Sequence, residues 1–297
     1  MNEAITPAVD GWRRSIDAEL SRVAAGELPV PGALRDAIHY SLTGEGKRLR
    51  GLLLLAAYDA VGGSGDASPL AAAVEVVHAY SLVHDDLPCM DNDSMRRGRP
   101  TTHRAYSVHV ATVAGVAMVP IAVRQTLLAA HGLGLDAAVA GQLVEVLMRA
   151  SGASGMVGGQ LLDLAGEGEA LSTTALEDVH RAKTGALIAA SLAMGGIAGG
   201  AGEDRVSALH SAGSALGLAF QIADDVLDAT ESSERLGKTA GADAALAKST
   251  YASAMGVSAA RERSDDLVRE AMDRLEAAGL RTPLLDDLAH FVSARRS

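Results

Sequence analysis

The chain has 297 residues, of which 48% are hydrophobic, and a formal net charge of −11. That charge argues against a nucleic-acid partner, whose phosphates the protein would repel, and it suits metal cations. The single cysteine, Cys89, excludes an intrachain disulfide. The first residues lack a signal-peptide pattern, and the longest apolar stretch, Val110–Val123, is shorter than the roughly 20 residues of a membrane span. We therefore expect a cytoplasmic protein without a membrane span.

Helix-forming residues dominate the chain from end to end. Ala and Leu are frequent, aromatic residues make up only 3%, and the alternation typical of strands is nearly absent. Gly-rich breaks separate segments with helical spacing, and several segments are too apolar to face water. We expect an all-α bundle of about ten or more helices, forming a single domain over residues 1–297. The predicted helices are Ala33–Leu42, Leu49–Val61, Ser68–His84, Thr101–His131, Ala138–Ser151, Ala175–Met194, Arg205–Asp228 and Ser258–Ala278.

The first acidic cluster follows the apolar helix predicted at Ser68–His84. It contains Asp85, Asp86 and Asp91, and Arg96 and Arg97 come directly after it. A solvated turn with neutralising charges would be the plainer interpretation. However, Pro88 disfavours helix at the residue before it, so these acids lie where an interior helix ends.

The second acidic cluster, Asp224, Asp225 and Asp228, follows Gln221 in an otherwise apolar segment. Asp224 and Asp228 are four residues apart, which places both carboxylates on one face of a helix. Buried carboxylates need donors or a cation. One such cluster is more often a solvated face, but two facing clusters in a helical bundle favour Mg²⁺, which binds few carboxylates and also accepts phosphate oxygens as ligands.

Basic residues complete the pattern. Lys47 and Arg50 enter a predicted helix, Lys183 precedes Thr184 in an apolar helix, and Lys238 lies in a glycine-punctuated loop. Taken singly, the first pair could be an exposed patch and Lys183 could extend from a core helix to solvent. Together with Arg96 and Arg97 they can hold two polyanions, since Arg and Lys suit phosphate. The apolar interior would receive a hydrocarbon.

These motifs resemble the trans-isoprenyl diphosphate synthases, the polyprenyl synthetase family. The resemblance runs in order through "GKRLR", "HAYSLVHDDLPCMD", "RRGRPTTH", "GGQLLDL", "KTGAL", "FQIADDVLD" and "LGKTAGAD", from about Gly46 to Asp243. It implies a single all-α domain around a central cavity, a homodimer, and Mg²⁺ with three ions per active site.

The resemblance also implies a role for each matching residue. His78 alone would more often be a satisfied core histidine, but its place in the motif assigns it to the isopentenyl diphosphate site. Mg²⁺ ligands for the allylic diphosphate would be Asp85, Asp86, Asp91, Asp224, Asp225 and Asp228. Allylic diphosphate contacts would be Arg96, Lys183, Thr184, Gln221 and Lys238, and isopentenyl diphosphate contacts Lys47, Arg50, His78 and Arg97. Of these, Asp85, Asp86, Asp224, Lys183 and Lys238 would be the residues that promote ionisation.

The implied reaction is loss of diphosphate from the allylic substrate, attack of isopentenyl diphosphate on the carbocation, and removal of a proton by the released diphosphate. A terpene cyclase would ionise the same substrate without condensation, but it has no need of a second diphosphate site. A non-catalytic regulatory subunit would be expected to lose aspartates, and all six are present.

The chain departs from the family at several positions. Many members have Gly-Glu at Ser107-Val108, Asp at Val116, a second lysine at Ala242 and an acid at Ser94, and Pro120 lies within a predicted helix. These departures bear on dimer packing, cavity shape and allylic diphosphate binding.

Product length is expected to depend on Tyr80 and Ser81, five and four residues before Asp85. A bulky ring about 7.5 Å below the metal site could stop a growing tail. The resemblance points the same way, because an aromatic residue there, with the two extra residues inside the first motif, is similar to bacterial farnesyl diphosphate synthases. We therefore favour a C15 product, with C20 geranylgeranyl diphosphate as the alternative. Tyr80 could instead only pack against neighbouring helices.

Overall fold

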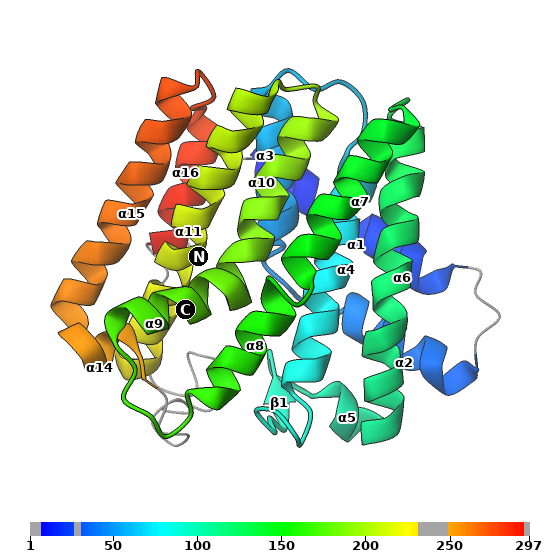
Figure 1. Cartoon of the computed structure of the whole chain (residues 1–297). Helices are drawn as coiled ribbons and strands as arrows, with labels where there is room; N and C mark the ends of the chain where they lie inside the picture. The colour runs from blue at the N-terminus through cyan, green and yellow to red at the C-terminus, as the bar shows by residue number, and fades with distance from the viewer. Residues whose placement is uncertain (1–6, 27–30, 231–248, 294–297) are drawn as a thin grey trace.

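The computed structural model describes residues 7–26, 31–230 and 249–293, and helices dominate these segments (Figure 1). The helices are α1 (Pro7–Ala25), α2 (Gly32–Leu42), α3 (Leu49–Ala60), α4 (Ser68–Asp85), α5 (Thr102–Ala105), α6 (Val108–Gly132), α7 (Ala137–Ser151), α8 (Met156–Ala165), α9 (Thr173–His180), the π-helical segment η1 (Arg181–Gly185), α10 (Ala186–Ala198), α11 (Glu203–Thr230), α14 (Tyr251–Met255), α15 (Val257–Ala277) and α16 (Pro283–Ser293). The strands are β1 (Met95–Arg96) and β2 (Arg99–Pro100), which pair antiparallel with Met95 opposite Pro100. The predicted all-α class is confirmed.

The most apolar helices lie inside the bundle. Every residue of α10 from Leu187 to Ala198 is buried, as is every residue of α3 from Leu49 to Tyr58. Helix α10 contacts α3, α7 and α11, while α4 contacts α1, α3 and α6. A helix that is apolar on all sides is stable only when other helices surround it, and this accounts for the arrangement in Figure 1.

Two predicted helices are divided in the structure. The segment predicted as one helix over Thr101–His131 is α5 followed by α6, because Ser107 is extended and caps α6 by accepting a hydrogen bond from Val110 N at 3.2 Å. Helix α6 itself continues across Pro120. The segment predicted as Ala175–Met194 contains the π-helical η1 between α9 and α10.

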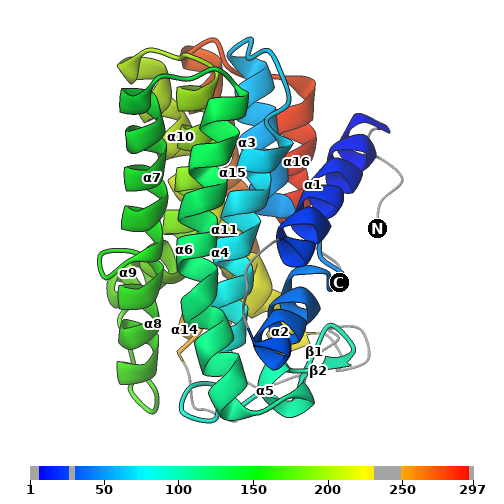
Figure 2. The same cartoon turned by 90° about the vertical axis from the view of Figure 1, so that its right-hand side faces the viewer.

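The two acidic motifs lie at the same end of the bundle. Helices α4 and α11 both run toward the lower end in Figures 1 and 2, where α8, α9, α14 and the β1–β2 hairpin also gather. The first motif is at the carboxyl end of α4, and Asp224, Asp225 and Asp228 lie in the last two turns of α11. The fold therefore brings together sequence motifs that are far apart in the chain.

Two of the described helices are long and apolar enough to cross a membrane by length and composition alone. They are Val108–Gly132 and Glu203–Thr230, and 44% and 56% of their apolar windows are buried in the protein. Core helices of soluble proteins meet the same criterion, so this is weak support for a membrane span.

Candidate active site

The first motif begins where α4 ends. Asp85 is the last residue of α4, and the chain turns so that Asp91 N donates to Asp85 O at 2.9 Å. Burial raises the pKa of Asp85 to about 6, with Lys183 and Arg96 opposing the shift and Asp91 and Asp86 adding to it. The carboxyl end of a helix also disfavours negative charge. This cluster therefore gains from a nearby cation.

Asp86 is held by an arginine of the hairpin. Arg96 Nε and Nη2 lie 2.7 and 2.6 Å from Asp86 Oδ1. Burial still raises the pKa of Asp86, and Arg96 opposes that rise. A charge-assisted contact of this kind fixes the hairpin against the end of α4.

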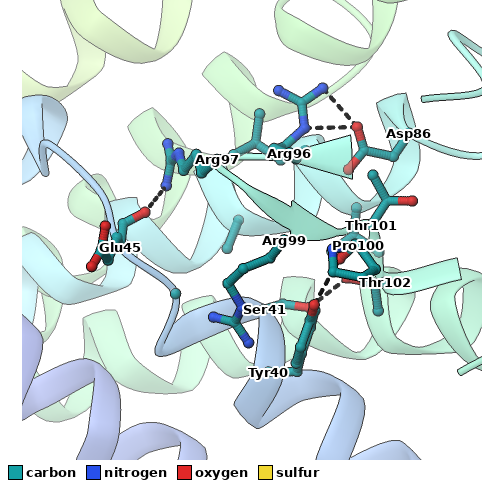
Figure 3. A pocket seen from close by; sticks show the side chains of 14 residues that line it. Tyr40, Ser41, Glu45, Asp86, Arg96, Arg97, Arg99, Pro100, Thr101 and Thr102 are labelled. Atoms are coloured by element: carbon teal, nitrogen blue, oxygen red, sulfur yellow. Dashed lines mark hydrogen bonds and ion pairs between the residues drawn. The ribbon is translucent and has the colours of Figure 1, made fainter. Parts of the chain in front are cut away.

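The turn of the hairpin has an unusual residue at its first position. Arg97 and Gly98 have φ of 52° and 73°, the positive values that a two-residue turn of type I′ requires. Glycine adopts such values readily, but an arginine does so at a cost. Arg97 Nη1 donates to Glu45 O at 2.7 Å, which ties the turn to the loop before α3 (Figure 3).

A pocket lies between this hairpin, α2 and α4 (Figure 3). Sequence analysis singled out Asp86, Arg96 and Arg97 from its lining. It did not predict Tyr40 and Arg99, whose guanidinium lies 4.0 Å from the centre of the Tyr40 ring. The lining residues are Tyr40, Ser41, Gly44, Glu45, Ala79, Leu82, Val83, Asp86, Arg96, Arg97, Arg99, Pro100, Thr101 and Thr102.

The residues expected at the isopentenyl diphosphate site lie near one another. His78, in α4, has a pKa well below its usual value, because it is buried and because Arg50, Arg97, Arg96 and Arg48 surround it with positive charge. The imidazole is therefore neutral near pH 7. Such a concentration of arginines around a neutral donor suits an anion.

Lys47, the remaining residue expected at that site, lies in the loop before α3. Its Nζ is 5.6 Å from the centre of the Phe291 ring in α16. The C-terminal helix thus packs beside the predicted diphosphate cluster.

Lys183 lies in η1 and contacts a carboxylate that sequence analysis did not assign. Its Nζ is 2.6 Å from Asp163 Oδ2 in α8. Helix α8 comes very close to η1 here, because a Cβ at Gly159 would lie 2.1 Å from Lys183 N. Gly159 and Asp163 both belong to the motif "GGQLLDL", so the motif brings α8 against the lysine.

The second motif has two environments. Gln221 accepts a hydrogen bond from Thr184 Oγ1 at 2.9 Å and donates to Asp225 Oδ1 at 3.2 Å. Asp225 Oδ2 also accepts from Tyr251 N at 2.9 Å. Asp224 and Asp228 are one turn apart on α11.

The segment around Lys183 interacts with both motifs. Its positive charge acts on Asp85 of the first motif, and its neighbour Thr184 bonds to Gln221 beside the second. Among the described residues, no group of three or more His, Cys, Asp or Glu side chains could hold a metal ion by itself. Lys238 and Ala242 lie outside the residues that the structure describes.

Comparison with known proteins identifies the family. The polyprenyl synthetase model matches residues 31–279. The chain belongs to the polyprenyl synthetase family. It is 36% identical over 297 residues to farnesyl diphosphate synthase of Bacillus subtilis (strain 168), covering 99% of both chains.

The similar proteins span more than two product classes, since they include farnesyl, geranylgeranyl and geranylfarnesyl diphosphate synthases. The heterodimeric geranylgeranyl pyrophosphate synthase large subunit 1, chloroplastic, of Arabidopsis thaliana is 42% identical over 256 residues, 85% of this chain and 69% of that one. A crystal structure of Helicobacter pylori geranyltransferase, complexed with magnesium and isoprenyl diphosphate, superposes with a TM-score of 0.82 at 30% identity, covering 98% of each chain. This polyprenyl synthetase is a short-chain trans-prenyltransferase with the all-α isoprenoid synthase fold.

Proposed function

We propose that this prenyltransferase condenses isopentenyl diphosphate with an allylic diphosphate and releases farnesyl diphosphate as its main product. Geranylgeranyl diphosphate is the alternative product, because similar proteins include synthases of both. A terpene cyclase is the less favoured interpretation, because it needs no second diphosphate site. The residues expected at that site lie together around His78.

One observation carries this proposal. Lys183 acts electrostatically on Asp85, and its neighbour Thr184 bonds to Gln221, so a single basic segment bridges the two acidic motifs. A diphosphate between the motifs would meet Lys183 and Arg96 directly. Basic side chains can bind the phosphate itself, while the acidic side chains beside them bind its counter-cations.

The residues of this site fit Mg²⁺. Carboxylate oxygens are its preferred protein ligands, and Asp91 and Asp86 both raise the pKa of Asp85, so these negative charges lie close together. We propose that the six motif aspartates surround the metal site with negative charge. Three Mg²⁺ ions would bind there together with the substrate. Since the described side chains do not form a protein-only metal cage, diphosphate oxygens would complete the coordination. Mg²⁺ bound there would neutralise charge on the departing diphosphate.

The chain's own residues would hold and separate the two substrates. The allylic diphosphate would be bound by Arg96, Lys183, Thr184, Gln221 and Lys238. Lys47, Arg50, His78 and Arg97 would bind isopentenyl diphosphate. The buried helices around them would exclude water and so protect the allylic carbocation from hydrolysis.

Product analysis tests the proposal. The purified protein would be incubated with Mg²⁺, isopentenyl diphosphate and, in separate reactions, dimethylallyl, geranyl or farnesyl diphosphate, and the products identified by mass. A C15 main product supports the farnesyl assignment, and a C20 product supports the alternative. Loss of diphosphate without incorporation of isopentenyl diphosphate would favour a cyclase, and no reaction would favour a regulatory subunit.

We also propose a cytoplasmic homodimer of single-domain subunits. Exposed apolar side chains gather on α6 and α8, as expected of an interface. Sedimentation of the wild type and of Val116→Glu tests the dimer, because a charge at that exposed position would dissociate an interface. The side chains are Val108, Val113, Val116, Leu127 and Leu128 on α6, and Val157, Leu161 and Leu162 on α8.

A further inference from the structure

Asp225 has a different environment from the other two aspartates of its motif. Asp224 and Asp228 are one turn apart on α11, and Asp225 lies about 100° around the helix from Asp224 and about 60° from Asp228. The Asp225 side chain is 3% exposed. A carboxylate buried to this extent stays ionised only with donors or a cation around it.

Three protein groups already supply those donors. Tyr251 N donates to Asp225 Oδ2 at 2.9 Å, and His180 Nε2 lies 3.3 Å from the same oxygen. Gln221 Nε2 donates to Oδ1 at 3.2 Å. Tyr251 is the first residue of α14, so its backbone N–H cannot turn away unless that helix moves. A metal ion at Asp225 would have to compete with donors on both oxygens.

The same contacts extend to the allylic diphosphate residues. An ionised carboxylate only accepts hydrogen bonds, so it determines which end of the Gln221 amide faces it. The other end, Oε1, accepts from Thr184 Oγ1 at 2.9 Å. Thr184 follows Lys183 in η1. A change at Asp225 therefore reaches the segment that carries Lys183.

The rings beside Asp225 fix the neighbouring helices. His180, at the end of α9, stacks on Tyr251 with centroids 5.7 Å apart and planes inclined by 24°. Asp225 is thus the point at which α9, α11 and α14 are joined by polar contacts.

We propose that Asp225 is a positioning residue and not a Mg²⁺ ligand. It holds α9 and α14 against α11 and, through Gln221, sets Thr184 and Lys183 for the allylic diphosphate. This assignment rests on the proposed function of the site, and it gives adjacent aspartates of one motif different tasks.

The first experiment measures binding without turnover. Thermal midpoints of the wild type, Asp225→Asn and the matched variant Asp224→Asn would be followed as Mg²⁺ is added with inorganic diphosphate present. Mg²⁺ that binds the folded protein raises the midpoint. We expect Asp225→Asn to keep the half-effective Mg²⁺ concentration within about twofold of wild type, and Asp224→Asn to need roughly tenfold more. An equal increase in the two variants would overturn the proposal.

The second experiment measures both Michaelis constants. Asp225→Asn should raise KM for the allylic diphosphate about tenfold, because an amide in place of the carboxylate puts a donor against donors. The KM for isopentenyl diphosphate should change by less than about twofold. An unchanged allylic KM contradicts the positioning role.

A third variant keeps the proposal testable if Asp225→Asn does not fold. His180→Phe removes one donor from Asp225 and leaves every motif aspartate in place. It should raise the allylic KM with no change in the Mg²⁺ requirement, and a wild-type allylic KM would count against the proposal. Failure of the proposed function would look different: the wild type would respond to Mg²⁺ and diphosphate but incorporate no isopentenyl diphosphate.

Discussion

The ring of Tyr80 packs edge-on against the imidazole of His84, with centroids 5.0 Å apart and planes inclined by 73°. His84 Nε2 in turn lies 3.1 Å from Thr112 O in α6. A Cβ at Gly115 would lie 2.1 Å from that nitrogen, so α6 leaves room for His84 only because residue 115 is glycine. Five residues before Asp85, Tyr80 therefore packs on a ring that itself contacts α6.

Replacing Tyr80 with Ala should lengthen the product by at least one five-carbon unit. The substitution removes a ring from the expected path of the tail, and the apolar space left would accept an isoprenyl unit. Mass analysis of products made from isopentenyl and geranyl diphosphates measures the change. Tyr80→Phe is the matched control, since it keeps the ring and should keep the product length. An unchanged distribution in Tyr80→Ala would move the limit to another residue.

Asp85→Ala and Asp224→Ala should each lower turnover by more than about a hundredfold, a loss of roughly 3 kcal/mol of transition-state stabilisation. Each removes a proposed Mg²⁺ ligand and no apolar packing group. Steady-state kinetics, with circular dichroism to verify folding, measures the effect. Asp204→Ala, at the exposed start of α11, is the control and should retain wild-type turnover. Near-normal activity of Asp224→Ala, still dependent on Mg²⁺, would contradict the assignment.

Much of this site could be predicted from sequence because its residues are local. Asp85, Asp86 and Asp91 follow a helix that Pro88 helps to end, and the predicted break is observed. The spacing of Asp224 and Asp228 predicts that they lie one turn apart, since the period of a helix is set by its local backbone geometry. The resemblance assigned Arg50 and Arg97 to the site of His78, and both act on it in the structure, together with Arg96, which was assigned to the allylic diphosphate, and Arg48, which was not assigned.

The contacts that sequence analysis missed are tertiary. Asp163 reaches Lys183 from another helix, and His180 and Tyr251 meet Asp225 across helix interfaces. An aspartate in "GGQLLDL" looks like any polar position of an amphipathic helix, so spacing does not indicate its partner. The π-helical η1 was also missed, because one altered turn leaves no periodic signal.

Substrate sites should be separable by mutation. Lys183→Gln should raise KM for the allylic diphosphate about tenfold, and Arg50→Gln should do the same for isopentenyl diphosphate, because a lost charge at one site cannot be replaced from the other. Michaelis constants for both substrates give the result. Arg149→Gln, whose side chain is 76% exposed on α7, should leave both constants unchanged. Equal changes in both constants for Lys183→Gln and Arg50→Gln would argue against two sites.

His78 should make the protein sensitive to acid. Its pKa in the folded state is lowered by burial and by the four arginines around it, from an ordinary value of 6.5. Above that pH both folded and unfolded states are neutral at His78, so it adds no pH dependence. Below it the unfolded state takes up a proton that the folded site excludes, and this residue's share of stability is lost at up to about 1.4 kcal/mol per pH unit.

Urea unfolding at several pH values between about 5 and 7.5 measures this loss. His78→Asn removes the titration, so the difference in unfolding free energy between wild type and variant should be constant above about pH 6.5 and should shift against the wild type below it. A difference that stays constant over the whole range would show that His78 takes up its proton equally in both states.

Arg97 should contribute to binding of isopentenyl diphosphate at a cost in the free energy of unfolding. It occupies the first central position of a type I′ turn, with φ of 52°, where asparagine is favoured and arginine is not. Arg97→Asn should therefore keep or raise the free energy of unfolding, by up to about 1 kcal/mol, although it removes the hydrogen bond to Glu45 O. It should also raise KM for isopentenyl diphosphate about tenfold, since the guanidinium is lost from the cluster around His78.

Urea unfolding and steady-state kinetics measure the two effects of Arg97→Asn. Arg97→Lys is the control, because it keeps the positive charge and does not improve the turn geometry. If Arg97→Asn lost stability as well as affinity, the bond to Glu45 would outweigh the backbone preference, and the arginine would be there to hold the hairpin.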